Sequence, residues 1–325
     1  MSSTVLWAAQ LDFFCSHVLL IPDARDLKRR DPVALLHLLA ERMHIRCPFN
    51  NIWDATNSMF LGDKRFKVAP YQLYTSPLIT RLLLGQGGTC TMLSTILVAL
   101  MKHLGYDAYM GMGITRNKVG MEMLHCIALV RTVTGSDDVW LIDPGTRLAP
   151  LFQAVPLHKV KSQGSVELGR SSFVMNKFVY SHDTNTYFRY YKHLGEGDEY
   201  SMFYETDEEE YCMKTPDDPG VLDFTQVGTK KRLVEYLKCR QRSKIDVGAF
   251  WEQNFILTGF KNGKAVVFVN NKLRLEDENG VLQESVLESK EQLKTVLFTN
   301  FPLLKCPEAM LFIDSLWNSK YGAHL

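Results

Sequence analysis

A cysteine at the start of a predicted helix is the first residue of this chain to which chemistry can be assigned. Cys90 follows Gly87-Gly88-Thr89 and opens a long apolar stretch that is typical of a helix. A thiol at a helix N-terminus lies near the positive end of the backbone dipole, which lowers its pKa toward the reactive thiolate. The paired glycines let the backbone and a substrate carbonyl approach each other without an intervening side chain. We therefore predict that Cys90 is a nucleophile.

A base and an orienting carboxylate are predicted further along the chain. His125 begins a strand-like segment, and Asp143 ends the next one, 139–143. A hairpin that turns near residue 135 places these two ends side by side, within about two residues of register. Asp143 would then hold the imidazole through one nitrogen, while the other nitrogen faces Cys90. Thiol acyl-transfer enzymes use this succession to attack a thioester and form an acyl-enzyme, which a second nucleophile resolves.

Simpler interpretations apply to the other residues of these types. A buried cysteine is usually an inert small hydrophobe, and we predict this for Cys126, in the middle of its strand. The acidic run 207–210 is typical of a solvated loop. The basic residues between 230 and 244 are typical of the solvent-exposed face of a helix; alternatively, they could bind the phosphates of a coenzyme. Six further histidines lack a partner pattern and are interpreted as structural or solvated: His37, His44, His103, His158, His182 and His193.

Helices are predicted to position the nucleophile. Asp31 suits the N-cap of a helix over residues 31–45, and Pro32 suits its first turn. After Cys90, apolar residues recur with helical spacing up to residue 104, and Gly105 supplies the stop. The chain is thus predicted to be mainly helical up to about residue 105.

Strands are predicted for most of the rest. Segments 106–114, 125–132 and 139–143 are short runs of strand type, and the aromatic stretch 170–215 also indicates strands. Near the C-terminus, Asn262-Gly263 and 277–280 each mark a hairpin, the former with a type I′ turn. Ser289 and Gln292 then form a capping box for a final helix. The predicted order is helices, a β-rich middle and an α/β end.

Composition limits the class of protein. The 325 residues suffice for two or three domains, and a net charge of +1 gives no reason to expect nucleic acid or an acidic membrane as a partner. The first 30 residues lack a secretory signal pattern, and no apolar run is long enough to span a bilayer. The seven cysteines are scattered without a C-x-x-C pair, which favours reduced thiols and argues against a zinc site or any other metal site. We expect a cytoplasmic protein.

Five segments, in order, resemble the motifs of one enzyme family. They are Pro48-Phe49-Asn50-Asn51-Ile52, Gln86-Gly87-Gly88-Thr89-Cys90-Thr91-Met92, Leu104-Gly105-Tyr106, the strand from His125 to Val130, and Asp143-Pro144-Gly145. They are similar to the Pro-Phe-Glu-Asn-Leu, Arg-Gly-Gly-x-Cys-x-Glu, Leu-Gly-Phe/Tyr, His-x-x-Leu-Val and Asp-Val-Gly segments of the arylamine N-acetyltransferases. The likeness runs from about residue 33 to residue 304, and the order and spacing of the motifs make it specific.

The resemblance implies an α+β fold with a helical domain, a central β-barrel domain and a C-terminal α/β lid, around a core like that of cysteine proteases. We place these domains at residues 1–105, 106–225 and 226–325. It also implies a Cys90, His125 and Asp143 triad that works by a ping-pong mechanism. An acyl-CoA, here expected to be acetyl-CoA, would be the donor and co-substrate with no permanently bound cofactor, and a small-molecule amine the acceptor.

Three positions depart from the family pattern. Glutamate, arginine and glutamate are replaced by Asn50, Gln86 and Met92, so a charged network near the nucleophile loop becomes neutral as a whole. Because losing one member alone would leave an unpaired buried charge, the joint loss is self-consistent. We expect an active but rebuilt site, in which an amide hydrogen bond of Asn50 and Gln86 replaces the ion pair, and a substrate other than a simple arylamine.

Three alternatives remain open at this level. One is a biosynthetic amide or ester synthase that takes its acyl group from a carrier-protein thioester. Another is a thiol hydrolase or a transglutaminase-like enzyme, because the same triad serves water or amide acceptors. The third is a non-catalytic binding protein on this scaffold, against which the intact cysteine, histidine and aspartate argue. Peptide N–H groups near Cys90 are the predicted oxyanion donors.

Overall fold

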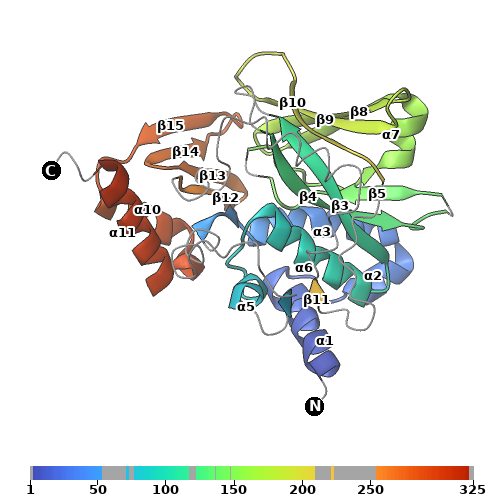
Figure 1. The fold of residues 1–325 in the computed structure, drawn as a ribbon, viewed down its shortest axis with the longest axis horizontal. Helices are drawn as coiled ribbons and strands as arrows, with labels where there is room; N and C mark the ends of the chain where they lie inside the picture. The colour runs from blue at the N-terminus through green and yellow to red at the C-terminus, as the bar shows by residue number, and fades with distance from the viewer. Residues whose placement is uncertain are drawn as a thin grey trace.

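A computed structural model gives the arrangement of most of the chain (Figure 1). It describes residues 3–52, 71–72, 77–116, 122–135, 137–146, 148–208, 221–222 and 254–321. The predictions for the basic residues 230–244 and for the end of the acidic run, 209–210, fall outside these residues. Within the described part of the chain, no helix is both long and apolar enough to cross a membrane.

Helices dominate the first hundred residues, as predicted. They are α1 (Ser3–Phe13) with the π-helical turn η1 (Phe14–Val18), α2 (Ala24–Arg30), α3 (Pro32–Arg46), α5 (Pro77–Leu83) and α6 (Cys90–His103). Helix α3 begins as its sequence indicates, because Asp31 Oδ1 accepts a hydrogen bond from Ala34 N at 2.9 Å. Helix α6 buries an apolar stripe and ends before Gly105, whose φ of +84° suits glycine.

An eight-stranded antiparallel sheet forms the middle of the molecule. Its strands are β3 (Asp107–Arg116), β4 (Glu122–Arg131), β5 (Val139–Ile142), β6 (Val155–Pro156), β7 (Ser165–Ser171), β8 (Val174–Ser181), β9 (Thr186–His193) and β10 (Ser201–Thr206). Their order is β6-β5-β4-β3-β10-β9-β8-β7, with helix α7 (Leu157–Gln163) packed against β5, β7 and β8. The sheet curls over the helices (Figure 1), and the predicted β-barrel is observed as this half-barrel.

A second sheet joins the two ends of the chain. Its strands β12 (Ile256–Lys261), β13 (Lys264–Val269), β14 (Lys272–Glu276) and β15 (Leu282–Val286) are C-terminal, but its edge strand is β1 (Phe49–Asn50). A short ladder also joins β2 (Tyr71–Gln72) to β11 (Val221–Leu222). Residues from the helical part therefore complete a sheet of the C-terminal part. The domain limits at residues 105 and 225 stay a prediction.

The C-terminal end agrees with its prediction in the hairpins and differs in the helices. Asn262 and Gly263 have φ of +51° and +78°, the backbone of a type I′ turn. In the capping box, Ser289 accepts from Gln292 N at 3.1 Å, but the Gln292 side chain accepts from Glu288 N at 2.8 Å instead of returning to Ser289. The helix α10 (Lys290–Asn300) is not the last one, and that prediction was wrong. A turn, η3 (Pro302–Leu304), and the helix α11 (Pro307–Tyr321) follow.

Candidate active site

The start of α6 holds Cys90 where the sequence places it. The preceding residue, Thr89, is extended, and its side chain makes no capping hydrogen bond to the helix. Cys90 is partly exposed. The backbone of Gly145 packs directly against Cys90, since a Cβ built on Gly145 would lie 2.3 Å from Cys90 Cα. The segment that follows β5 therefore contacts the first residue of α6.

The paired glycines fit the loop before Cys90 against a neighbouring segment. Gly87 has φ of +71°, and a Cβ there would lie 1.8 Å from the Pro48 carbonyl oxygen. Gly88 N donates to the same oxygen at 3.1 Å, and Asn50 N donates to Gly88 O at 3.0 Å. Close packing against Pro48 thus explains why Gly87 suits its position. Access for a substrate carbonyl stays a prediction.

His125 and Asp143 are brought into contact by the β4–β5 hairpin. Strand β4 begins at Glu122, three residues before the predicted start, and β5 ends at Ile142, so Asp143 directly follows it. The observed register pairs Ala128 with Ile142, which sets His125 and Asp143 two residues out of step. His125 Nε2 nevertheless lies 2.8 Å from Asp143 Oδ1, and both side chains are buried.

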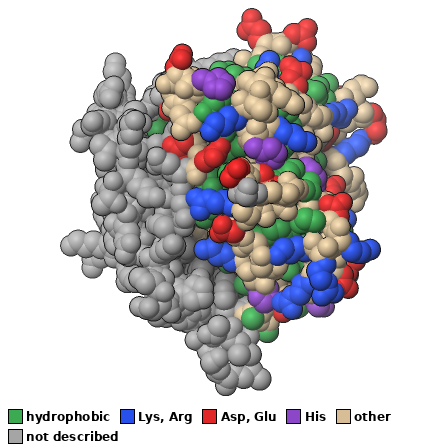
Figure 2. Space-filling model, turned by 90° about the vertical axis from the view of Figure 1, so that its right-hand side faces the viewer, with side chains coloured by type: hydrophobic (Ala, Val, Ile, Leu, Met, Phe, Trp, Pro, Cys, Tyr) green, Lys and Arg blue, Asp and Glu red, His purple; other side chains and the backbone are tan. Residues whose placement is uncertain are grey.

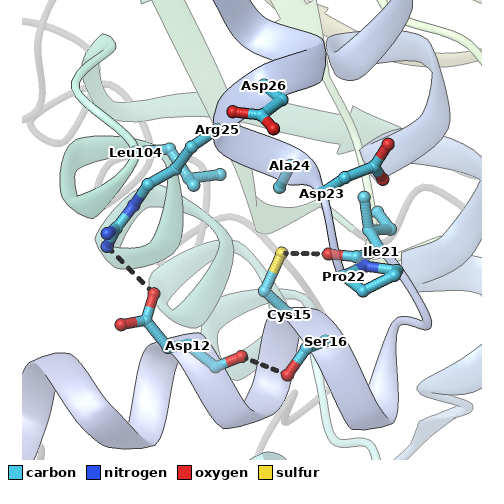
Figure 3. Close-up of a pocket in the computed structure, with 10 residues that line it drawn as sticks. All are labelled: Asp12, Cys15, Ser16, Ile21, Pro22, Asp23, Ala24, Arg25, Asp26 and Leu104. Carbon is cyan, nitrogen blue, oxygen red and sulfur yellow. Dashed lines mark hydrogen bonds and ion pairs between the residues drawn. The ribbon is translucent and has the colours of Figure 1, made fainter.

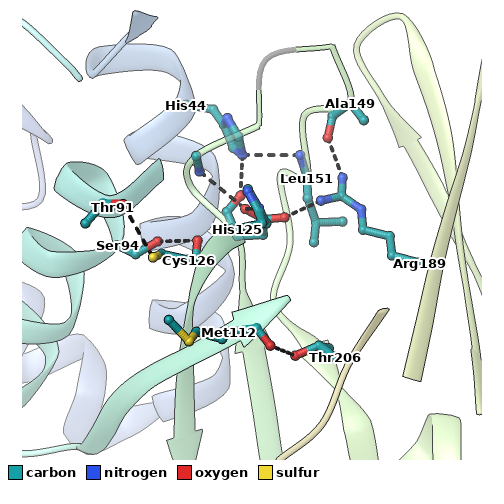
Figure 4. Close-up of polar contacts among 12 residues, drawn as sticks. His44, Thr91, Ser94, Met112, His125, Cys126, Ala149, Leu151, Arg189 and Thr206 are labelled. Atoms are coloured by element: carbon teal, nitrogen blue, oxygen red, sulfur yellow. Dashed lines mark hydrogen bonds and ion pairs between the residues drawn. The ribbon is translucent and has the colours of Figure 1, made fainter. Parts of the chain in front are cut away.

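The Cys90 and His125 side chains lie close enough for each to shift the pKa of the other. Because Nε2 of His125 contacts Asp143, Nδ1 is the nitrogen left for the sulfur. The structure therefore brings the three predicted residues together in the order sulfur, imidazole, carboxylate. Figure 4 shows the polar contacts around His125 as dashed lines.

The electrostatics of these groups are coupled. Burial lowers the pKa of His125, but Asp143 outweighs it and raises this pKa to about 10. Burial raises the pKa of Asp143, and His125 and Arg189 hold it below its usual range. Contact with Cys126 and burial raise the pKa of the Cys90 thiol, against the lowering effect of His125. The net direction at Cys90 is upward, opposite to what the helix position predicts, so its thiolate depends on the His125 imidazolium.

Arg189 is a buried charge of the site that sequence reasoning missed. It lies on β9, is 0% exposed, and donates from Nη1 to Asp143 Oδ2 at 2.5 Å. Its Nη2 donates to Asn176 Oδ1 at 2.9 Å and to the Ala149 carbonyl. A signal existed in the sequence, because strand alternation places Arg189 on the same face as Tyr187, which is also buried.

Cys126 and His44 also reach the site, in different ways. Cys126, predicted as packing, is buried, but its sulfur contacts Thr91 Oγ1 at 3.4 Å and its thiol raises the pKa of Cys90. His44 on α3 is buried, and its Nε2 lies 2.9 Å from the Asp143 carbonyl oxygen and 3.2 Å from Leu151 N. Burial lowers the pKa of His44 to about 4, so this ring is neutral and structural, as predicted.

The three neutral positions near the nucleophile make few contacts with one another. Asn50 is fully buried, and its Nδ2 donates to the backbone carbonyl of Gln86 at 3.0 Å and to that of Pro48 at 3.2 Å. The Gln86 side chain turns to the C-terminal part, where Nε2 donates to Leu303 O at 2.8 Å. Met92 packs its sulfur over Gly88. The expected replacement of an ion pair by a hydrogen bond between the Asn50 and Gln86 side chains was therefore wrong: Asn50 donates to the Gln86 backbone, and the Gln86 side chain bonds elsewhere.

A cavity of about 290 Å³ lies at the opposite end of α6 from Cys90 (Figure 3). Leu104 lines it together with residues of α1, η1 and α2, and an Asp12–Arg25 ion pair of 3.0 Å crosses its edge. It takes no part in the contacts described above. Among the described residues, no group of three or more His, Cys, Asp or Glu side chains is arranged to hold a metal ion.

Comparison with known proteins identifies the fold. Neither protein-family models nor curated protein sequences match this chain. Solved structures do: the arylamine N-acetyltransferase from Mycobacterium abscessus matches with a TM-score of 0.63 at 16% identity, over 94% of both chains. The enzyme from Salmonella typhimurium matches with a TM-score of 0.58 at 15% identity, over 87% of this chain and 92% of that one. The Mycobacterium marinum enzyme in complex with CoA gives 0.59 at 12%, over 87% and 93%. The protein therefore has the fold of the arylamine N-acetyltransferases, as the sequence resemblance implied.

Proposed function

We propose that this protein is a cysteine acyltransferase that carries an acyl group from an acyl-CoA to an amine. The observation that carries this proposal is the succession of Cys90, His125 and Asp143 at the start of α6, where His125 is hydrogen-bonded to Asp143 and shifts the pKa of the partly exposed Cys90. The arylamine N-acetyltransferase fold supports it, and one neighbour of that fold is a complex with CoA, which favours acyl-CoA as the donor.

The first half-reaction would load the cysteine. His125 takes the Cys90 proton, and the thiolate attacks the thioester carbonyl carbon to form a C–S bond. The C–S bond to CoA then breaks, and the leaving CoA sulfur receives the proton from His125. Asp143 stays ionised, because His125 and Arg189 lower its pKa, and it holds the imidazole in place. Backbone N–H groups at the start of α6 are our proposed donors to the oxyanion.

The second half-reaction would discharge the acyl-enzyme. An amine attacks the acyl carbon while His125 accepts its proton, and the Cys90 sulfur leaves as a thiolate that His125 reprotonates. Free enzyme is regenerated, so donor and acceptor never need to be bound together. Because Asn50, Gln86 and Met92 replace the family's charged residues, we propose an acceptor other than a simple arylamine.

Intact-protein mass spectrometry after incubation with acetyl-CoA tests this proposal. We expect one acetyl adduct in the wild-type protein, none in Cys90→Ala, and loss of the adduct when an amine is added. Loss of the adduct in water alone at the same rate would instead identify a thiol hydrolase. Adduct formation only from a carrier-protein thioester would identify a synthase, and no adduct from any thioester would contradict catalysis altogether.

A further inference from the structure

Arg189 is a buried charge to which the reaction scheme above gives no direct task. Its guanidinium is fully buried and forms an ion pair with Asp143, which is also 0% exposed. Desolvating a charged pair is costly, and a hydrophobic replacement of similar volume is often no less stable. The stability of the fold is therefore a weak explanation for an arginine at this position.

The guanidinium is fixed on every side. Nη2 and Nε both donate to Asn176 Oδ1, at 2.9 and 3.3 Å, and Nη2 also donates to the Ala149 carbonyl. Asn176 is in turn held by Pro150 O, to which its Nδ2 donates at 3.0 Å. The ring of Phe203 lies 5.2 Å from the guanidinium carbon. Since the fork of an arginine is planar and rigid, these contacts allow it one orientation.

That orientation completes the contacts of Asp143. Oδ1 faces His125 Nε2 at 2.8 Å and accepts from Gly145 N at 3.4 Å. Oδ2 accepts from Arg189 Nη1 at 2.5 Å. With each oxygen engaged, the carboxylate plane is set so that Oδ1 points at the imidazole. Figure 4 shows Arg189 beside His125, with a dashed line from the guanidinium to Ala149.

The charge balance of the site depends on this pair. Arg189 and Asp143 sum to zero, and Cys90 and His125 also sum to zero, both as thiol with imidazole and as thiolate with imidazolium. Without the Arg189 charge, Asp143 would be a buried anion that only protonation of His125 neutralises. Loss of Arg189 would raise the already elevated pKa of His125 further, and a more tightly bound proton would weaken its use as a base.

The other titratable groups around His125 leave this balance unchanged. They come from several elements: His44 from α3, Cys90 from α6, Cys126 from β4 and Tyr204 from β10. The pKa of His44 is lowered to about 4 and that of Tyr204 is raised by burial, so both are neutral near pH 7. The two thiols shift each other's pKa in opposite directions, upward for Cys90 and downward for Cys126. Arg189 and Asp143 are thus the fixed charges among the described residues in contact with the imidazole or its carboxylate partner.

We propose that Arg189 is a positioning residue that aims the Asp143 carboxylate and balances its charge, so that His125 can both accept and release a proton. The purpose of this arrangement rests on the proposed acyl transfer. The proton affinity of His125 itself can be measured without any acyl donor.

The test is an NMR titration of His125 in the 325-residue protein with ¹⁵N-labelled histidine rings, in which the His125 signal is assigned with the His125→Gln variant. In Arg189→Gln, we expect the His125 pKa to rise by about one unit or more, because the imidazolium must now balance Asp143 alone. Asn176→Asp keeps the arginine but adds a carboxylate that competes for its charge, so we expect a rise in the same direction. The matched control is Lys192→Gln, which removes a cation from the same strand, where it pairs with Asp198 at 3.3 Å.

Thermal melts show which variants are folded, and Asn176→Asp decides the question if Arg189→Gln does not fold. A His125 pKa that stays at the Lys192→Gln value, or falls, in a folded variant would overturn the proposal and leave Arg189 a packing residue. The acyl-adduct experiment is independent of this one. Wild-type protein that forms no adduct but shows the expected pKa shifts would refute the proposed function and keep the role of Arg189.

Discussion

At the scale of single residues, the neighbours of Cys90 set its pKa and therefore its reactivity. Cys126 is predicted from sequence to be a packing residue, yet its thiol raises the pKa of the proposed nucleophile, Cys90. His125 acts on the same sulfur in the opposite direction. The reactivity of Cys90 is therefore set by two competing contacts, and each of them can be removed separately.

Replacing Cys126 should make Cys90 react at lower pH. In Cys126→Ala the contact that raises the pKa of Cys90 is lost, and the effect of His125 remains. We expect the pH midpoint of Cys90 alkylation by iodoacetamide to move down by about one unit, read at the Cys90 peptide by mass spectrometry. Cys306→Ala, which removes a partly exposed thiol of the C-terminal part, is the control. A midpoint that moves upward would show that Cys126 stabilises the thiolate.

His44 should make the fold sensitive to acid. Its ring accepts the Leu151 N–H and is buried neutral, with a pKa of about 4 against 6.5 in the unfolded chain. A depressed pKa gives stability that is complete above pH 6.5 and is lost as pH falls toward 4. At pH 5 this loss is about 2 kcal/mol relative to pH 7.

Urea unfolding at pH 7 and pH 5 measures this loss. We expect the free energy of unfolding to fall less between these pH values in His44→Gln than in wild type. His182→Gln, which removes an exposed histidine near the β8–β9 turn, should behave as wild type. Equal pH dependence in all three proteins would mean that His44 is not the acid-sensitive group.

At the scale of elements, the site is the meeting point of a helix start, a hairpin and the segment after β5. The hairpin connection is fixed by Asp138, whose carboxylate accepts from Val133 N at 2.7 Å and Thr134 N at 2.6 Å. The segment after β5 approaches α6 so closely that residue 145 has no room for a side chain. The close contact between these elements therefore requires glycine at position 145.

A methyl group at Gly145 should separate the nucleophile from its base. Its Cβ would lie 2.3 Å from Cys90 Cα and 2.5 Å from Cys90 Cβ, so the backbone must move apart. In Gly145→Ala we expect acyl transfer to fall by about 100-fold, because a misplacement near 1 Å costs that much. The measurement is the rate of acetyl-Cys90 formation. Gly169→Ala is the matched control, since a Cβ there meets nothing within 4 Å, and an unchanged rate in Gly145→Ala would contradict the close contact.

At the scale of the whole molecule, the C-terminal sheet is tied to the helical part through the segment just before residue 52. Phe49 and Asn50 pair with Thr258 and Leu257, and Phe49 also bridges to Gly88, two residues before Cys90. Asn51 stabilises this pairing of residues 49–50 with β12, because its side chain accepts from Ile256 N at 2.9 Å and donates to Asn254 O at 2.6 Å. The geometry of the nucleophile loop thus depends on residues 200 positions away.

Removing the Asn51 amide should weaken the contact between residues 49–50 and β12. Asn51 is fully buried, so Asn51→Ala leaves the buried Ile256 N–H and the part-buried Asn254 carbonyl without these partners. We expect the free energy of unfolding to fall by about 2 to 4 kcal/mol in urea titrations. Asn279→Ala, at an exposed turn position, should change it by less than about 0.5 kcal/mol. A similar small change in Asn51→Ala would show that the two parts are held together by other contacts.

Local chemistry was readable from the sequence wherever neighbours in the chain decide the outcome. The cap at Asp31, the start of α6 at Cys90 and the Asn262-Gly263 turn agree with their predictions, because each depends on residues within one turn of the chain. The helix α11 was not predicted, although its buried residues, Ala309, Phe312, Ile313 and Leu316, have helical spacing. The meeting of His125 with Asp143 was predicted through the hairpin, since only 18 residues separate them.

Tertiary packing alone decided the rest. Arg189 lies 46 residues from Asp143, and β1 lies some 200 residues from its partner β12, so no local pattern connects either pair. The pKa of Cys90 likewise follows from Cys126 and His125, which reach it from another element. The sequence by itself determined which groups are available for chemistry, because residue type and helix position are local properties. The protonation states and orientations of these groups were decided by the fold, because burial and charge pairing exist only after distant strands have packed together.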